Sequence, residues 1–484
     1  MMRIQSMRRH KAIALSTIAL VTFCSLTPAQ AKPAPKLLPI KVGRPISVWD
    51  VPAEASLQLF QESAAIPPTP NARLLAHYID KRVRLSPTQA LEVDREGLGE
   101  RWAPIATDTP SSGEWFTGGK FVNLTFFFRG SSWWVACLDT YEAAQAELRV
   151  TCLDADADGA YWEPNDYVRW GDGAFRALGY CKDFDDGTAT GSLRLISKNK
   201  QPFFVFTEAA RTAGIDDATW AACRELNRLR NLHGMPPCAH WPEANELLTK
   251  HATFLTQHDP NNEDLLVSLW GQSEGLDGFD QATSDMSLAA AIAWLADKED
   301  VSHQISRALL GARDRPALFF ARQGKLGIGR AAHWSCLKSA QSDEGPGQRY
   351  CIIPTAGSKN VPRQSLMSKS GPLSSTSLFN QERGLPISIH IDPALVTGSF
   401  TVQVQSIALS TLLDSVPVAG FSFSIRDFDP NAEEHSFFFV PEAPLKPDTQ
   451  YCVLALIEGG RTAKGSDARG MTVDRLTWTF RTSM

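Results

Sequence analysis

The spacing of apolar residues changes twice along this 484-residue chain, and each change limits how the next segment can fold. Between Phe121 and about residue 205, runs such as "FVNLTFFF" and "LRVTCL" are rich in aromatic and β-branched residues, which predicts strands. Apolar residues then recur at helical spacing between residues 216 and 258. After residue 384 they alternate with a period of two, as in "LTWTF", which is typical of a β-sandwich. We therefore expect several units rather than one continuous core.

The middle of the chain predicts three helices. "DDATWAACRELNRLRNLHG" begins with acids and ends at Gly234, a favourable C-terminal stop. "PEANELLTKHATFLTQH" carries an apolar stripe that includes His251, which we expect to be a buried core histidine. "SDMSLAAAIAWLADKED" carries another stripe behind a cap at Ser284 or Asp285. The members of this last stripe are Leu288, Ala291, Ile292 and Leu295.

The regions around these helices are less regular. Residues 32–110 are dotted with prolines, and only "NARLLAHYIDKRVRL" has a helix-like pattern. Residues 357–383 are rich in Ser, Gly and Pro with few large apolar groups, which predicts a linker. Beyond it, "PISIHID" points Ile387, Ile389 and Ile391 toward one face of a strand.

The first 31 residues predict a signal peptide. A basic start and the apolar run "AIALSTIALVTFC" precede an Ala-x-Ala cleavage signal at Ala29–Ala31. The mature protein should begin near Lys32 and be exported to the periplasm or the extracellular space. No later run reaches the roughly 18 apolar residues of a membrane helix, so we expect no transmembrane segment.

Net charge argues against some partners. Removing the leader takes away four basic residues and no acid, which changes the formal charge from −5 to −9. An acidic exported protein is poorly suited to gripping nucleic acid by bulk charge. We expect a ligand drawn from lipids, glycans or cell-wall components instead.

The mature chain keeps an even number of cysteines, which in an oxidising compartment predicts structural disulfides. Three pairs lie close in sequence and suggest local bridges, although eight cysteines allow 105 connectivities. The pairs are Cys137/Cys152, Cys223/Cys238 and Cys336/Cys351, with Cys181 and Cys452 remaining.

Four stretches resemble the CAP (SCP) superfamily of cysteine-rich secretory, antigen-five and pathogenesis-related proteins. They are "LNRLRNLHGMPP" (226–237), "HATFL" (251–255), "AIAWLAD" (291–297) and "DRPALFFARQGKLGIG" (314–329). In CAP domains the Gly-x-Gly segment begins a central strand packed closely against helices. Gly324, Gly327 and Gly329 could instead suggest a phosphate-binding loop, but no Lys-Ser/Thr pair and no clear helix follow them. The strand interpretation is preferred.

The resemblance also implies a cleft. Many CAP domains line it with two histidines and two acids that can hold a divalent cation. At the matching positions this chain has Glu263 and Asp314, so an intact transition-metal site is not expected. Nearby candidates for an altered acidic cleft are His258, Glu274 and His303. The alternative is that these polar groups are simply solvated.

The C-terminal region resembles a bacterial immunoglobulin-like module. The matching residues are "PLKPDTQYCVLAL" (444–456) and "TWTFRT" (477–482). Such modules usually act as spacers or stalks.

The segment "LDADADGAYWEPND" resembles the first half of a calcium-binding loop. Asp154, Asp156 and Asp158 alternate, and Gly159 permits a sharp turn. Asn165 occupies the twelfth position, where a bidentate Glu normally closes such a loop. Calcium is therefore the one cofactor that the sequence suggests, and the alternative is an ordinary acidic turn.

These features predict a multidomain α+β protein. It has a signal peptide (1–31), a β-rich N-terminal region (32–205), a CAP-like α/β/α sandwich (212–356), a linker (357–383) and an immunoglobulin-like β-sandwich (384–484). No nucleophile elbow or metalloprotease helix is found in the sequence. We expect an exported, non-catalytic binding or cell-envelope interaction protein. The alternatives are a hydrolase acting on envelope polymers or proteins through the altered acidic cleft, and a purely structural surface protein.

Overall fold

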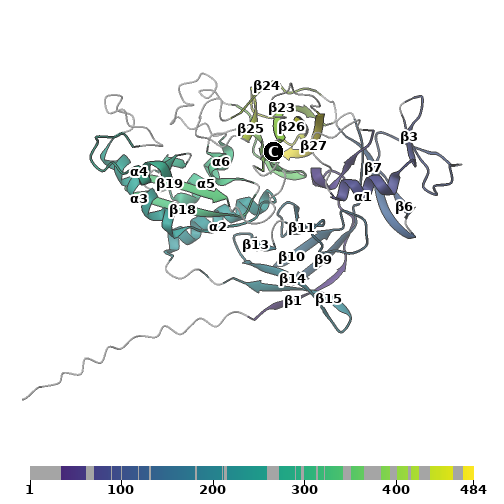
Figure 1. Ribbon diagram of the computed structural model, residues 1–484, viewed down its shortest axis with the longest axis horizontal. Coiled ribbons are helices and arrows are strands. Elements are labelled where there is room, and N and C mark those ends of the chain that lie inside the picture. The colour runs from purple at the N-terminus through teal and green to yellow at the C-terminus, as the bar shows by residue number, and fades with distance from the viewer. Residues whose placement is uncertain are drawn as a thin grey trace, which may run out of the picture.

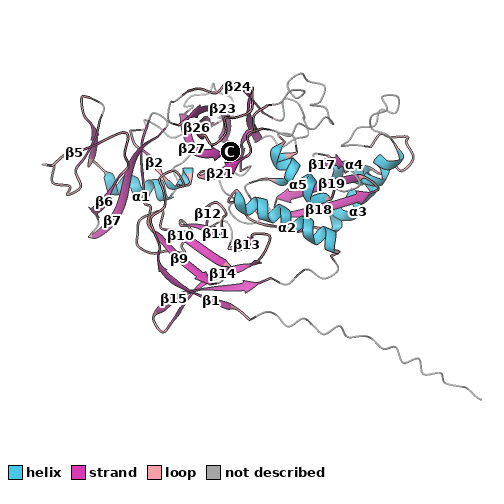
Figure 2. Ribbon diagram, turned by 180° about the vertical axis from the view of Figure 1, so that it is seen from behind, coloured by secondary structure: helices cyan, strands magenta, loops and turns pink. Residues whose placement is uncertain are grey.

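The computed structural model describes most of the chain after residue 33. The described ranges are 34–60, 70–88, 90–99, 101–117, 119–129, 132–145, 147–179, 182–209, 211, 215–258, 272–288, 290–295, 299–311, 314–320, 322–341, 350–364, 383–392, 400–412, 416–424, 436–461 and 472–484. The protein is β-rich and consists of several units (Figure 1). The C-terminal strands lie between the helical unit and the β6–β7 hairpin of the N-terminal region (Figure 2).

An eight-stranded antiparallel sheet dominates the N-terminal region. Its order is β12-β11-β10-β9-β1-β15-β14-β13. The strands are β1 (Lys36–Val42), β9 (Thr140–Gln145), β10 (Leu148–Leu153), β11 (Tyr167–Trp170), β12 (Arg176–Ala177), β13 (Asp183–Asp185), β14 (Thr190–Lys198) and β15 (Gln201–Glu208). Because β1 pairs with both β9 and β15, the proline-dotted start of the chain supplies a central strand.

Two smaller sheets complete this region. One has the order β2-β8-β7-β6, and the other β3-β4-β5. Their elements are β2 (Leu57–Gln58), β3 (Val83–Leu85), β4 (Leu91–Val93), β5 (Ala103–Ile105), β6 (Ser111–Thr117), β7 (Lys120–Arg129) and β8 (Ser132–Ala136), with the 3-10 turn η1 (Ala53–Ala55) and helix α1 (Pro70–Ile79). The strand expectations for residues 121–128 and 148–153 are confirmed. The helix-like stretch 71–85 is confirmed only as far as Ile79, because Val83–Leu85 form β3.

Helices cover both faces of a four-stranded sheet in the middle unit. The sheet order is β16-β18-β19-β17. Its elements are α2 (Asp217–Leu232), β16 (Cys238–His240), α3 (Pro242–Gln257), α4 (Gln281–Ser287), β17 (Ala291–Trp294), α5 (Val301–Leu310), α6 (Arg315–Leu318), β18 (Gly324–Ala331) and β19 (Trp334–Gln341). The apolar core on one face contains side chains of α2, α5 and α6, and that on the other contains side chains of α3.

The glycines of β18 explain how closely α3 approaches this sheet. A Cβ atom at Gly327 would lie 2.5 Å from Ala244 Cβ, and one at Gly329 would lie 2.1 Å from the Leu248 carbonyl carbon. Real Cβ atoms do not come so close, so only glycine fits. The phosphate-loop interpretation is therefore wrong, and the expectation of a tightly packed strand is confirmed.

Two of the three helices predicted here are confirmed, and the third is wrong. Asp216 caps α2 and Gly234 follows it with a φ of +67°, as the sequence indicated. However, α4 begins after Asp280 and ends at Ser287, and Ala291–Trp294 form β17. This short apolar run pairs with β19, so sheet pairing outweighs its helical spacing.

The C-terminal unit contains two four-stranded sheets, β20-β22-β25-β24 and β21-β27-β26-β23. The strands are β20 (Tyr350–Ile353), β21 (Ser358–Val361), β22 (Ile387–Ile391), β23 (Phe400–Thr411), β24 (Gly420–Ser424), β25 (Ser436–Pro441), β26 (Gln450–Arg461) and β27 (Thr472–Thr482). Ile387, Ile389 and Ile391 share its core with Trp478, as predicted. The expected boundaries differ, because β20 and β21 lie in segments assigned to the CAP-like unit and the linker.

The cysteines differ from the disulfide expectation. Seven of the eight cysteines that follow residue 31 are described, and all seven are buried free thiols. Cys336 and Cys351 lie in separate apolar clusters, as do Cys137 and Cys152. Cys223 and Cys238 share one cluster without a bond. Closeness in sequence therefore did not bring Cys336 to Cys351 or Cys137 to Cys152, because the two members of each pair pack into different apolar clusters.

Among the described residues there is no helix with the length and apolar character needed to cross a bilayer.

Candidate functional site

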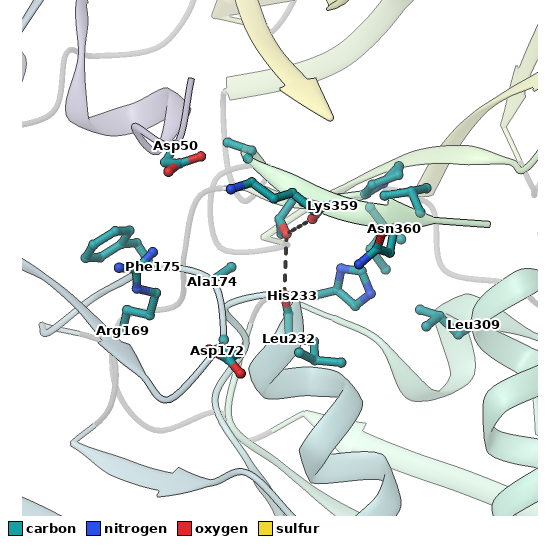
Figure 3. Close-up of a pocket in the computed structure, with 18 of the residues that line it drawn as sticks. Asp50, Arg169, Asp172, Ala174, Phe175, Leu232, His233, Leu309, Lys359 and Asn360 are labelled. Carbon is teal, nitrogen blue, oxygen red and sulfur yellow. Dashed lines mark hydrogen bonds between the residues drawn. The ribbon is translucent and has the colours of Figure 1, made fainter. Parts of the chain in front are cut away.

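A cavity of about 570 Å³ lies where the three units meet (Figure 3). The N-terminal region contributes Arg169 and Phe175, the helical unit contributes His233 and Arg315, and the segment between β20 and β21 forms the remaining wall. Asp50 and Arg169 lie on one side of the cavity and Leu309 on the other, with His233 between them (Figure 3). At the end of α2, Thr355 Oγ1 donates to the Leu232 carbonyl oxygen at 3.5 Å, which links two of the units.

Arg315 is the most deeply buried charge in this cavity, with a fully buried side chain. It donates from Nε to the Leu309 carbonyl oxygen at 2.8 Å, and from Nη1 to Pro386 O at 2.8 Å and Ser388 Oγ at 2.9 Å. All of these acceptors are neutral, and Nη2 has no partner. Burial therefore lowers the pKa of Arg315 to about 9.

His233 follows α2 as its C-cap and presents its ring to the cavity. Its Nδ1 atom is buried without a hydrogen-bond partner. Burial, together with the nearby positive charge of Arg315, lowers the pKa of His233 to about 3. The imidazole is therefore neutral at physiological pH and offers one donor and one acceptor.

The opposite side of the cavity has a different balance of charges. Asp50 is half-buried, and burial raises its pKa against the opposing effects of Lys359 and Arg169. The Arg169 guanidinium stacks on Phe175, with 4.7 Å from its carbon to the ring centroid, and its buried Nε has no partner. Arg149 forms an ion pair with Asp172 at the rim. Four basic and two acidic side chains line the cavity, which leaves it positively charged in an acidic protein.

The acidic segment flagged in the sequence forms the loop between β10 and β11. Oxygen atoms of Asp154, Asp156 and Asp158 all lie within 4.8 Å of one another, and among the described residues no other such group of three or more His, Cys, Asp or Glu side chains exists. Asp154 accepts the backbone N–H groups of Asp158 and Gly159 at 3.2 and 2.9 Å. Gly159 has a φ of +80°, so the glycine permits the turn as predicted.

Burial changes the acidity of this loop. It raises the pKa of Asp154 to about 7, with further increases from the charges of Asp156 and Asp158. Asp166, next to the loop, has its pKa raised to about 8, chiefly by burial and also by the same three carboxylates. None of these four acids forms an ion pair within the described ranges, although Lys120 is near enough to lower the pKa of Asp156.

The predicted acidic cleft is only partly described. Glu263 lies outside the described residues. His303 belongs to the capping box of α5, where its Nδ1 lies 2.8 Å from Asp300 Oδ1. His258 Nε2 lies 2.8 Å from the Asp277 carbonyl oxygen. Glu274 is exposed in the turn before α4, and Asp314 occupies the N-cap of α6. The described members therefore lie at the ends of different elements.

His251 is fully buried in the α3 core, as expected for a core histidine. Sequence reasoning did not find Arg169, His233 or Arg315, because their segments meet only through tertiary packing. The proline after Arg315, which begins α6, was the one local signal near them. Asn71, which sequence reasoning also missed, is buried beside the acidic loop and donates from Nδ2 to the Asn165 carbonyl oxygen at 2.7 Å.

No family model matches the chain, and no curated protein matches it either.

Proposed function

We propose that this protein is an exported, non-catalytic binding protein whose small anionic ligand occupies the cavity between the three units. One observation carries the proposal: Arg169 Nε, His233 Nδ1 and Arg315 Nη2 are buried in its walls without a hydrogen-bond partner. More than nine in ten buried polar groups in native proteins are paired. Two guanidinium donors and one imidazole nitrogen, all unpaired around one cavity, support a bound molecule that pairs with them.

The charge of the cavity selects the class of ligand. A buried guanidinium that bonds only to neutral acceptors is destabilised by desolvation, and an anionic group beside it would offset that cost. Leu232, Leu309 and Ile353 provide apolar walls for the rest of the molecule. Pockets for small molecules usually have volumes of about 300–1,000 Å³ and combine apolar walls with a few polar groups. The ligand should therefore carry a carboxylate, phosphate or sulfonate on an apolar body.

The CAP-like and immunoglobulin-like assignments are part of the same proposal. Helices on both faces of the β16-β18-β19-β17 sheet support a CAP-like α/β/α sandwich. In the C-terminal unit the Tyr451 hydroxyl accepts the Lys446 backbone N–H at 2.8 Å, which resembles the tyrosine corner of immunoglobulin-like domains. Export rests on the leader sequence. In this arrangement the sandwich is more than a spacer, because it closes one wall of the cavity.

The dye 1-anilinonaphthalene-8-sulfonate tests the binding proposal, because it joins a sulfonate to an apolar body. We expect one dye molecule per folded chain, with enhanced fluorescence. Ala356→Phe should fill the cavity and Lys359→Met should remove a charge from its rim, and each should weaken dye binding at least tenfold. Lys198→Met, on an exposed strand position far from the cavity lining, is the matched control. Dye binding that both cavity variants retain would refute the proposal.

The hydrolase alternative has a separate test. If purified protein releases soluble fragments from peptidoglycan, and Asp314→Ala abolishes the release, the protein is an enzyme. The non-catalytic proposal would then be wrong even if the dye binds in the cavity.

A further inference from the structure

Strand pairing brings a fourth carboxylate to the acidic loop. Leu153, the last residue of β10, is opposite Tyr167, the first residue of β11, in the antiparallel register. Asp154 and Asp166 lie next to this pair, just beyond the ends of the two strands. The charges of Asp154, Asp156 and Asp158 all act on Asp166, which shows that its carboxyl group is their neighbour.

Two buried side-chain oxygens at this loop have no hydrogen-bond partner. Asp166 is 1% exposed; its Oδ2 accepts the Glu163 backbone N–H at 2.8 Å, but its Oδ1 has no partner. Asn71 is 3% exposed and is held by its Nδ2 at the Asn165 carbonyl oxygen, while its Oδ1 also has no partner. An unpaired acceptor in the interior is costly, and two beside three clustered carboxylates indicate that a cation belongs among them.

We propose that Asn71, Asp154, Asp156, Asp158 and Asp166 form a calcium site. Its donor set contains only oxygen atoms, four carboxylates and one amide, which suits a hard cation and not zinc. Oxygens bound to one calcium at about 2.4 Å can lie at most about 4.8 Å apart, and the three loop carboxylates satisfy this limit. Asp166 lies outside that group, so its carboxylate must move toward the ion on binding. In this site Asp166, one residue after the twelfth position at Asn165, takes the role of the Glu that normally closes a calcium loop.

The site would join two parts of the N-terminal region. Asn71 lies on α1, which packs with the β2-β8-β7-β6 sheet, whereas the loop belongs to the eight-stranded sheet. A bound ion would therefore crosslink these sheets. Magnesium fits less well, because it requires near-ideal octahedral geometry at about 2.0–2.1 Å and keeps several waters.

Terbium luminescence provides the test, because Tyr161 and Trp162 lie within the loop and can sensitise a lanthanide bound there. With the purified mature protein, we expect one terbium per chain, displaced by calcium and not by an equal concentration of magnesium. Calorimetry with calcium alone should give the same stoichiometry. Asp156→Asn and Asp166→Asn should each weaken calcium binding at least tenfold. Asp217→Asn, on a largely exposed residue of α2 outside both the loop and the cavity lining, should leave it unchanged.

Asp166→Asn also guards against a variant that merely misfolds. It replaces a buried, unpaired carboxylate with a neutral side chain of the same shape, so in chelator its unfolding midpoint should equal or exceed that of the natural protein. No calcium heat and identical melting curves in calcium and in chelator would overturn the site. So would an Asp166→Asn variant that binds calcium as tightly as the natural protein. Neither result depends on the cavity where the three units meet. The calcium-site proposal and the ligand-binding proposal can therefore be refuted independently.

Discussion

Two acidic turns of the N-terminal region look alike in sequence and differ in their surroundings. "DADADG" at 154–159 and "DFDDG" at 183–187 each combine three aspartates with a glycine at positive φ. In the second turn the chain itself supplies the partners. Asp185 forms an ion pair with Arg224 at 3.2 Å and accepts from Asn227 Nδ2 at 3.0 Å. Asp186 accepts from Trp170 Nε1 at 2.8 Å.

The pKa values follow this difference only in part, because burial raises the pKa of Asp185 in spite of its partners. Burial would raise the pKa of Asp186, but hydrogen bonds from Ala189 and Thr188 outweigh it and hold the pKa below its usual value. At Asp154 and Asp166 burial prevails, and the pKa values rise to about 7 and about 8. Aspartate spacing alone therefore does not identify a cation site. A cation site is indicated where carboxylates are buried and the protein supplies neither a basic side chain nor enough hydrogen-bond donors to pair with them.

The largest expected effect comes from a substitution in the second turn (183–187), whose aspartates have partners within the protein. Asp185→Ala leaves the mostly buried Arg224 without its ion-pair partner, and removing one member of a buried pair costs about 3–5 kcal/mol. Because Arg224 retains some exposure, we expect a loss near the lower end, about 3 kcal/mol. Denaturant titration should give the same loss in calcium and in chelator. A loss that calcium restores would place a cation at this turn as well.

Calcium bound at the first turn (154–159) should stabilise the protein by nearly as much. At a free concentration one hundred times its dissociation constant, it should raise the free energy of unfolding by about 2.7 kcal/mol. Asp156→Asn should lose this gain, while Asp186→Asn should keep it despite lower stability. The comparison fails if Asp186→Asn loses the calcium effect and Asp156→Asn does not.

The pH dependence in chelator should reveal the same turn. The pKa values of Asp154 and Asp166 are raised in the folded state, so the folded chain binds protons more tightly than the unfolded chain. Their contribution to stability is full below the unfolded pKa near 3.8 and is lost as pH rises through about 7 to 8. Between pH 5 and pH 7 we expect the free energy of unfolding to fall with each unit of pH, because the folded chain holds protons on these two carboxyls that the unfolded chain has lost. Asp166→Asn should flatten this slope in denaturant titrations; an unchanged slope would mean that other groups cause it.

Local sequence patterns predicted where helices and strands form better than they predicted which elements pair or pack together. Helical spacing and end signals identified α2 and α3, because a cap and a glycine stop act within the element itself. The same spacing failed at Ala291–Trp294, where pairing with β19 decides the conformation. The first half of the acidic loop was visible in sequence, but Asn71 comes from a helix more than eighty residues away. The cavity where the three units meet had no sequence signal, because its unpaired nitrogens belong to Arg169, His233 and Arg315, which lie far apart in the sequence.

The smallest effects should come from the two glycines. Gly159 and Gly187 have φ values of +80° and +83°, a region that costs a residue with a Cβ roughly 1–2 kcal/mol. Around Gly159 nothing lies within 4 Å of an added Cβ, so Gly159→Ala should lose only about 1 kcal/mol in chelator. At Gly187 an added Cβ would lie 2.9 Å from Arg228 Cβ, so Gly187→Ala should lose more.

Calcium separates the two substitutions further. Gly159 permits the turn that brings Asp158 back toward Asp154, so strain there should also weaken calcium binding, which calorimetry measures directly. Gly187→Ala should lower stability and leave calcium affinity unchanged, because its aspartates bond to Arg224, Asn227 and Trp170 instead. Equal calcium affinities in both variants would show that the conformation at Gly159 does not set the geometry of the site, and that the carboxylates alone hold the ion.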